Sequence, residues 1–261
     1  MSLIYINPYV FTVTGTGWTP ANITTQLWLD ASDSATITTV SSKVSQWNDK
    51  SGNTRNATQS TDANRPTYTT AGLNGLNVIT FTTASFQSMV MSSVISSGAS
   101  SGSIFWVQKN TFDPPTVTED IGSFISKTWG TPSPYNHFPF LDGDVYMGAF
   151  RNTRINAGNP TPSLTTPRIV GIESNSSSYK MLIDGTSFYT GGGSFALPPS
   201  SVTIGEPALY AFRGYAAELI VVDSILSTGD REKIEGYLAH KWGITSGLPS
   251  GHPYKSVAPS A

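Results

Sequence analysis

The sequence contains no cysteine, so no disulfide can brace the fold. A chain of 261 residues can bury enough apolar surface without such bonds. Charged residues are also scarce, at 12% of the chain, and 15 basic against 17 acidic side chains leave no positive excess for binding phosphates. We therefore expect no nucleic-acid partner.

The hydrophobic runs that membranes and export require are missing as well. No stretch approaches the roughly 20 apolar residues of a membrane span. The opening segment MSLIYINPYVF has neither the basic region nor the continuous apolar core of a signal peptide. We expect no membrane insertion and no general secretory export.

Motifs for catalysis are missing too. No two glutamates have the same-strand spacing that a retaining glycosidase needs for its nucleophile and acid. The three histidines are too far apart for a local metal motif, and no serine lies in a Gly-x-Ser-x-Gly elbow. The sequence therefore predicts a protein that is not an enzyme.

Short apolar or alternating segments separated by polar turns dominate the chain and predict β-strands. The expected strands lie at residues 78–81, 103–107, 145–150, 168–173, 179–183 and 201–204. Asp184-Gly185 between two such segments predicts a hairpin, because a type I′ turn needs positive φ at both central residues. No fixed-period repeat is present, which argues against a propeller or solenoid.

The chain ends differently, in a buried strand followed by one helix. The apolar run 217–222 is typical of a strand covered on both faces. Ser227 and Asp230 form a capping pair, Ile234, Leu238 and Trp242 recur at helical spacing, and Gly243 supplies a stop.

Four motifs carry a resemblance to a known family: LWLD at 27–30, VSQWNDKSGNTRNATQ at 44–59, RPTY at 65–68 and EGYLAHKWG at 235–243. They resemble the concanavalin A-like lectin/glucanase superfamily, and in particular the LamG-like jelly-roll domains of bacterial surface proteins and tailed-phage virion proteins. The resemblance spans 27–243 and implies an all-β fold, a two-sheet antiparallel β-sandwich with one short C-terminal helix. We expect an N-terminal arm at 1–25, the sandwich at 26–245 and a C-terminal loop and tail at 246–261.

An aromatic, proline-rich loop at 128–141 is the main candidate contact surface, for a glycan or a protein partner. Its candidate residues are Trp129, Tyr135, His137 and Phe138. A second candidate patch contains Tyr210 and Arg213, residue types that are enriched at interfaces. The alternative in both places is that the aromatic rings pack into the core.

The N-terminal segment carries Tyr5, Tyr9 and Phe11 outside the sandwich pattern. Such an arm either covers an edge of its own sheet or docks onto another subunit. A homo-oligomer formed through this arm is compatible with the sequence.

Calcium is the cofactor that the resemblance suggests. Asp142 and Asp144 flank a glycine in a way that suits a hard cation, and the loop 48–53 offers several oxygen ligands. Both segments are equally typical of turns, because Asp and Asn side chains bond to nearby backbone.

The resemblance implies a non-enzymatic virion structural protein of a tailed phage, a capsid decoration or tail-associated module on the virion surface whose partners are other virion proteins. Together with the missing export signal, the resemblance implies a protein assembled in the host cytoplasm and released by lysis. The alternative is a lectin-like adhesin that recognises host cell-surface glycan. A glycoside hydrolase is a third class, and the missing carboxylate pair argues against it.

Overall fold

The computed structural model describes residues 17–82, 86–113, 122–130, 136–161, 163–205 and 211–261. Its strands are β1 (Leu27–Asp30), β2 (Ile37–Val40), β3 (Lys43–Trp47), β4 (Ala57–Thr58), β5 (Thr67–Leu73), β6 (Leu76–Phe81), β7 (Met89–Ser92), β8 (Ser101–Asn110), β9 (Val145–Met147), β10 (Ile155–Gly158), β11 (Arg168–Asn175), β12 (Ser178–Ile183), β13 (Thr186–Gly192), β14 (Ser201–Ile204) and β15 (Gly214–Val222). The α-helix is α1 (Thr228–Lys241). Within the described ranges, no helix is long and apolar enough to cross a membrane.

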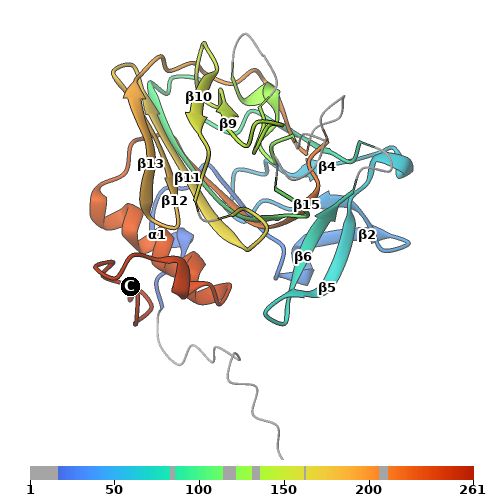
Figure 1. Cartoon of the computed structure of the whole chain (residues 1–261). Coiled ribbons are helices and arrows are strands. Elements are labelled where there is room, and N and C mark those ends of the chain that lie inside the picture. The colour runs from blue at the N-terminus through green and yellow to red at the C-terminus, as the bar shows by residue number, and fades with distance from the viewer. Residues whose placement is uncertain (1–16, 83–85, 114–121, 131–135, 162, 206–210) are drawn as a thin grey trace, which may run out of the picture.

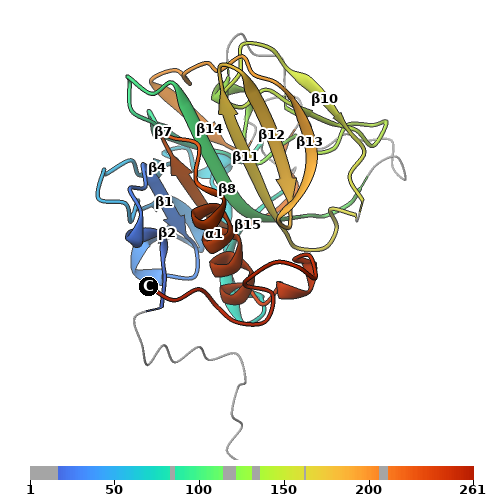
Figure 2. The same cartoon turned by 90° about the vertical axis from the view of Figure 1, so that its left-hand side faces the viewer.

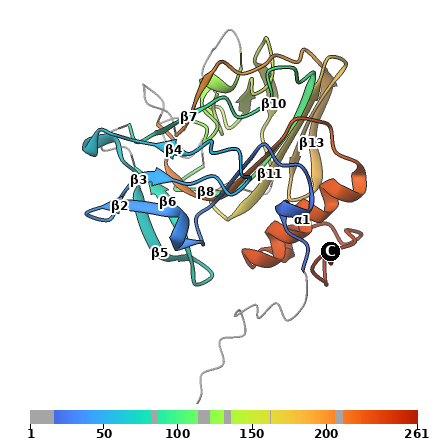
Figure 3. The same ribbon diagram turned by 180° about the vertical axis from the view of Figure 1, so that it is seen from behind.

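Antiparallel pairing joins 13 strands in the order β13-β12-β11-β8-β15-β6-β5-β3-β4-β7-β14, with β1 added to β15 and β2 to β3. Strands β9 and β10 form a separate two-stranded sheet. The β2–β3 and β5–β6 hairpins lie together on the side of the molecule away from β13 (Figures 1 and 3). Residues of β7 and β14 share one buried cluster with residues of β8, β11 and β15, so the sheet closes over a common core as a β-sandwich.

The central strands β8 and β15 are buried on both faces. Ile104 and Trp106 of β8 point into the sandwich core, whereas Phe105 and Val107 belong to a second cluster with α1. Strand β15 alternates in the same way, with Ile220 on the helix side. Figure 2 shows α1 lying across β8, β11 and β15. The prediction of a doubly covered strand near the C-terminus is confirmed.

The predicted boundaries of the helix and the hairpin are also confirmed. Ser227 caps α1, since its Oγ accepts a hydrogen bond from the Asp230 backbone amide at 3.1 Å, and Gly243 follows the helix at φ +65°. Asp184 and Gly185 have φ of +51° and +77°, as a type I′ turn requires. The expected strand 145–150 is shorter than predicted, because β9 ends at Met147 and the chain then turns.

A buried ionic cluster, the Lys241 network, fixes α1 to the sheet. Asp30 and Glu218 lie opposite each other in the β1–β15 register. The Lys241 ammonium is 2.7 Å from a carboxylate oxygen of each. The indole nitrogens of Trp28 and Trp242 donate to Glu218 at 2.6 and 2.8 Å. Residues of the LWLD and EGYLAHKWG motifs are therefore joined in this network, which holds α1 against the sheet.

The two acids of the network differ in their pKa. Burial alone raises the pKa of Asp30, but Lys241 and Lys50 outweigh it and lower that pKa to about 2. Burial raises the pKa of Glu218, and the Lys241 charge opposes this effect without cancelling it. Both carboxylates are almost fully buried beneath α1, so no glycoside can reach them.

The segment after α1 packs against the helix instead of leaving it. His252 Nε2 lies 3.1 Å from Glu235 Oε2, and Gly17 forms a β-bridge with Ser260. Trp18, at the other end of the described chain, packs edge-on against Tyr237 of α1. Residues 17–25 and 246–260 thus pack against the folded body.

Two glycines of α1 give opposite predictions when each is replaced by alanine. A Cβ at Gly236 would lie 2.4 Å from Tyr254 Cβ, whereas a Cβ at Gly229 meets only Ser227 Oγ at 4.0 Å. We expect Gly236→Ala to lower the free energy of unfolding by about 1–3 kcal/mol through overpacking. Gly229→Ala should raise it by about 0.5 kcal/mol, because alanine favours the helix. Urea denaturation of both variants measures the difference, and a stabilised Gly236→Ala would show that Tyr254 does not pack there.

Candidate functional site

The aromatic loop expected as a contact surface is split between core and surface. Trp129 and Phe138 have no exposed surface, and the Trp129 Nε1 donates to the Thr203 carbonyl at 2.8 Å. Phe138 packs edge-on against Trp106 of β8. The prediction of these two rings as contact residues is therefore wrong, because both are buried in the hydrophobic core, where their apolar surface is removed from water.

His137 lies beside β9, is only 4% exposed, and begins the local hairpin that leads to the surface. Its backbone N–H donates to the Tyr146 carbonyl at 2.8 Å, and the Tyr146 N–H donates back to the His137 carbonyl at 3.0 Å. The chain reverses between them through a tight turn, in which Gly143 has φ +88° and the Asp142 carboxylate accepts the Asp144 N–H at 2.9 Å. Strand β10 then pairs with β9 and places Asn156 opposite Tyr146.

This local hairpin gathers a compact set of exposed and half-buried side chains around the buried His137 ring, and we call this set the β9–β10 patch. Its members are His137, Phe140, Asp142, Asp144, Tyr146, Arg154 and Asn156. The small sheet lies at the end of the molecule away from α1 (Figure 1). The sequence therefore identified His137, Asp142 and Asp144 of this patch. It missed Tyr146, Arg154 and Asn156, which are joined to them only by strand pairing.

A chain of hydrogen bonds fixes the polar side chains of the patch. The Tyr146 hydroxyl donates to Asp142 Oδ2 at 2.8 Å. The Asn156 amide donates to Asp144 Oδ2 at 2.7 Å and to the Tyr146 hydroxyl at 3.3 Å. The Arg154 guanidinium stacks over the Tyr146 ring, 4.8 Å from its centre. The patch therefore presents an aromatic ring, two carboxylates, an amide and a guanidinium in fixed positions.

The titratable groups of the patch have shifted pKa values. Burial, together with the charge of Arg154, lowers the pKa of His137 to about 4. The hydrogen bond to Asp142 raises the pKa of the Tyr146 hydroxyl. At neutral pH His137 is therefore uncharged and the Tyr146 hydroxyl keeps its proton, so the patch offers both donors and acceptors.

The residues anticipated as calcium ligands have protein partners. Asp142 and Asp144 each accept hydrogen bonds inside the hairpin. Among the residues that the structure describes, no group of three or more His, Cys, Asp or Glu side chains could hold a metal ion. The arrangement at 142–144 fits a turn better than a cation cage.

The second anticipated calcium loop, 48–53, is organised around Asp49. Its carboxylate accepts four hydrogen bonds, from the backbone amides of Trp28, Ser51 and Arg55 and from the Ser51 hydroxyl. Four donors use the lone-pair positions of a carboxylate. Asp49 therefore anchors the loop to β1, and its oxygens are not offered to a cation.

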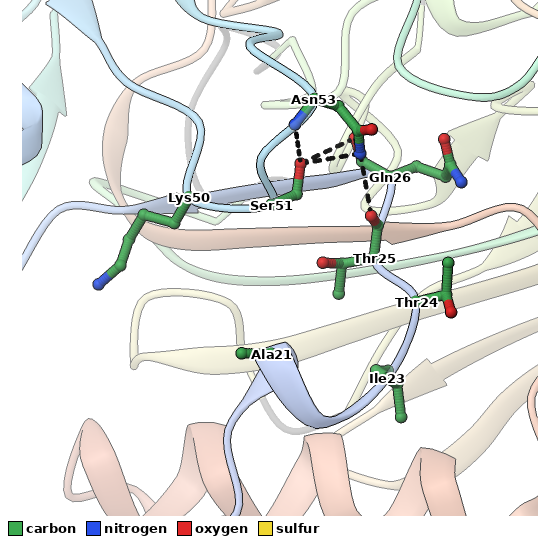
Figure 4. A pocket seen from close by; sticks show the side chains of 8 residues that line it. All are labelled: Ala21, Ile23, Thr24, Thr25, Gln26, Lys50, Ser51 and Asn53. Atoms are coloured by element: carbon green, nitrogen blue, oxygen red, sulfur yellow. Dashed lines mark hydrogen bonds between the residues drawn. The ribbon is translucent and has the colours of Figure 1, made fainter.

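A polar hollow of about 260 Å³ separates this loop from the segment that leads into β1. Figure 4 shows its lining, in which the Asn53 amide donates to the Thr25 carbonyl at 3.1 Å and to Ser51 Oγ at 3.0 Å. Lys50 lines the hollow but forms ion pairs with Asp30 and Asp33 at 3.0 and 2.8 Å. The described side chains that line the hollow are mostly polar, and none of them is aromatic.

Of the remaining predicted contact residues, the structure describes only Arg213. Arg213 is half-buried, and its guanidinium lies 5.4 Å from the centre of the Phe112 ring. Tyr135 and Tyr210 lie outside the described residues, and so do the arm residues Tyr5, Tyr9 and Phe11.

No family model matches the chain, and no curated protein matches it. The chain does match solved structures. The binding domain of botulinum neurotoxin serotype D is 11% identical over 81% of this chain and 50% of that one, with a TM-score of 0.58. The binding domain of Paraclostridial Mosquitocidal Protein 1 is 10% identical over 84% and 53%, with a TM-score of 0.57.

A third similar structure is domain 4 of AbnA, a GH43 extracellular arabinanase from Geobacillus stearothermophilus, solved in complex with arabinotriose. It is 14% identical over 78% of this chain and 95% of that one, with a TM-score of 0.52. The present chain spans about half the length of the two toxin binding domains. The likeness shows the fold, and the predicted all-β sandwich with one helix is confirmed.

Proposed function

We propose that this protein is a non-catalytic binding domain that recognises carbohydrate on a receptor surface through the β9–β10 patch. The observation that carries the proposal is the Tyr146 ring held between Asp142, Asn156 and Arg154. Aromatic rings provide contact area at low entropic cost, and carboxylate and amide groups bond to hydroxyls. Its support from the fold is that similar structures are described as binding domains or contain a bound sugar.

The test is binding of the purified protein to a broad glycan panel that includes arabinotriose, with calcium and with a chelator. We expect Tyr146→Ala to weaken binding about tenfold or more, because the ring and its hydroxyl are both lost. Tyr146→Phe keeps the ring and loses only the hydrogen bonds to Asp142 and Asn156, so it should bind with intermediate affinity.

The control for this experiment is the folded state of each variant. Tyr146 is only half-buried, so both variants should unfold at nearly the same denaturant concentration as the wild type. A Tyr146→Ala protein that binds its glycan with unchanged affinity would rule out the patch as the binding site.

The location on a phage virion, which the motifs imply, stays a prediction from the sequence. It is compatible with a glycan-binding role, since a surface module of a virion can meet a host cell. The partners expected for that role are other virion proteins, and the arm residues expected to reach them lie outside the described residues.

A further inference from the structure

A second hollow, the hairpin hollow, lies where the β12–β13 turn meets the segment after α1. Its volume is about 260 Å³. The polar and aromatic side chains that line it are those of Asn159, Thr161, Asp184, Thr186, Ser187 and Phe188. It is formed by residues outside the β9–β10 patch.

The walls of the hairpin hollow are held in place by the sheet. Phe188 is half-buried and packs against the sandwich core, so its ring is a fixed apolar wall. Asp184 is 4% exposed and accepts hydrogen bonds from the Ile169 N–H and from Arg168 Nη1, both at 2.8 Å. The backbone at Gly247 closes this side, since a Cβ there would lie 2.8 Å from Asp184 Oδ2. Binding groups supported in this way lose little freedom when a ligand arrives.

The rim of the hollow has unused hydrogen-bonding capacity. Asn159, Thr161 and Thr186 are exposed, and their side chains make no hydrogen bond to any other described residue. An amide and two hydroxyls can each donate and accept. Sugar hydroxyls also do both, so the rim matches a polyhydroxylated ligand.

The charge of the hollow selects against anions. Asp184 is its only charged lining side chain among the described residues, and Arg168 pairs with it at 2.8 Å. No lysine or arginine of the described chain lines the hollow, so a carboxylated or phosphorylated ligand would find no counter-charge. The hollow of Figure 4 differs in charge and in lining, because Lys50 lines it and none of its described lining residues is aromatic.

We propose that the hairpin hollow binds one neutral sugar ring, with the apolar face of the sugar on Phe188 and its hydroxyls on Asn159, Thr161 and Thr186. The volume is slightly below the roughly 300–1,000 Å³ of pockets for drug-sized ligands, which fits a single ring. A ligand of about a dozen non-hydrogen atoms binds with a dissociation constant on the order of millimolar. The proposal concerns a second site and stands whether or not the β9–β10 patch binds sugar.

The experiment is a titration of the ¹⁵N-labelled full chain with neutral glucose, galactose, mannose, arabinose and N-acetylglucosamine, and with anionic N-acetylneuraminic acid. Thr186→Trp fills the hollow from an exposed position. Thr190→Trp places the same ring on an exposed position of the same strand outside the hollow. We expect at least one neutral sugar to shift the amide signals of 159–161 and 184–188. Binding should weaken about tenfold or more in Thr186→Trp and stay within about twofold in Thr190→Trp.

Four outcomes would overturn the proposal. The first is no shift at these residues at high millimolar concentration of any neutral sugar. The second is a response to N-acetylneuraminic acid alone, and the third is equal weakening by both tryptophan variants. Shifts confined to the β9–β10 patch would also overturn it while supporting the function proposed above, so the two proposals fail separately.

Discussion

Replacing Lys241 by methionine should lower the free energy of unfolding by about 3–5 kcal/mol, the usual cost of removing one partner from a buried ion pair. The ammonium lies 2.7 Å from oxygens of both Asp30 and Glu218, which are 3% and 0% exposed. Without it, two carboxylates face each other across β1 and β15 with one ammonium fewer between them. Methionine keeps most of the stem volume, so the loss reports charge and not packing.

Guanidinium denaturation of the wild type and the variant measures this loss. Lys233→Met is the matched control, because Lys233 is on the same helix, is half-buried and forms no ion pair with a described residue. It should change stability by no more than about 0.5 kcal/mol. Adding Glu218→Gln to Lys241→Met should recover part of the loss, since the uncompensated charge is then removed. Equal effects of the two lysine variants would contradict the network.

The same variant should alter the response to acid. The folded pKa of Asp30, about 2, is below its ordinary value of 3.8. Its contribution to stability is therefore complete above pH 3.8 and is lost as the pH falls toward 2. Without Lys241 the folded pKa rises, so less stability remains to be lost in that window. The slope of stability against pH between 4 and 2 should be shallower in Lys241→Met than in the wild type.

Replacing Trp129 by alanine should cost about 3–5 kcal/mol of stability, as large-to-small changes in a core do. The ring is fully buried beside Phe150, and its Nε1 bonds to the Thr203 carbonyl. The variant would leave both a cavity and an unpaired buried carbonyl.

Comparison with Tyr146→Ala separates core from surface within one stretch of chain. Denaturation should show a large loss of stability for Trp129→Ala and almost none for Tyr146→Ala. Glycan binding should be weakened in Tyr146→Ala and retained in Trp129→Ala, provided that Trp129→Ala is assayed at a temperature where it stays folded. A Trp129→Ala protein of normal stability that fails to bind would restore the exposed-loop interpretation.

The pattern of residues predicted those parts of the fold that depend on local chemistry. The Asp184-Gly185 turn needs positive φ, and Ser227 caps the first turn of α1, so both follow from residue type. The nearly continuous apolar run at 217–222 predicted the double burial of β15 in the same way.

Features that depend on long-range pairing could not be predicted. Trp28 and Glu218 are 190 residues apart and meet only because β1 pairs with β15. Apolar composition at 128–141 could not show that Trp129 enters the core, nor that His137, which is also buried, packs against Phe140 in the β9–β10 patch. Tyr146 and Asn156 became neighbours through the register of β9 and β10.

The bridge between Gly17 and Ser260 has a consequence for how the domain can be mounted. With the Trp18 N–H bonded to the Pro259 carbonyl at 3.2 Å, both ends of the described chain leave from one pole, beside α1, while β9 and β10 occupy the other pole (Figure 1). A carrier protein joined at either end would contact the α1 side of the molecule and leave the β9–β10 hairpin on the opposite side, exposed to solvent. The same geometry allows the domain to be spliced into a loop of another protein without separating its strands.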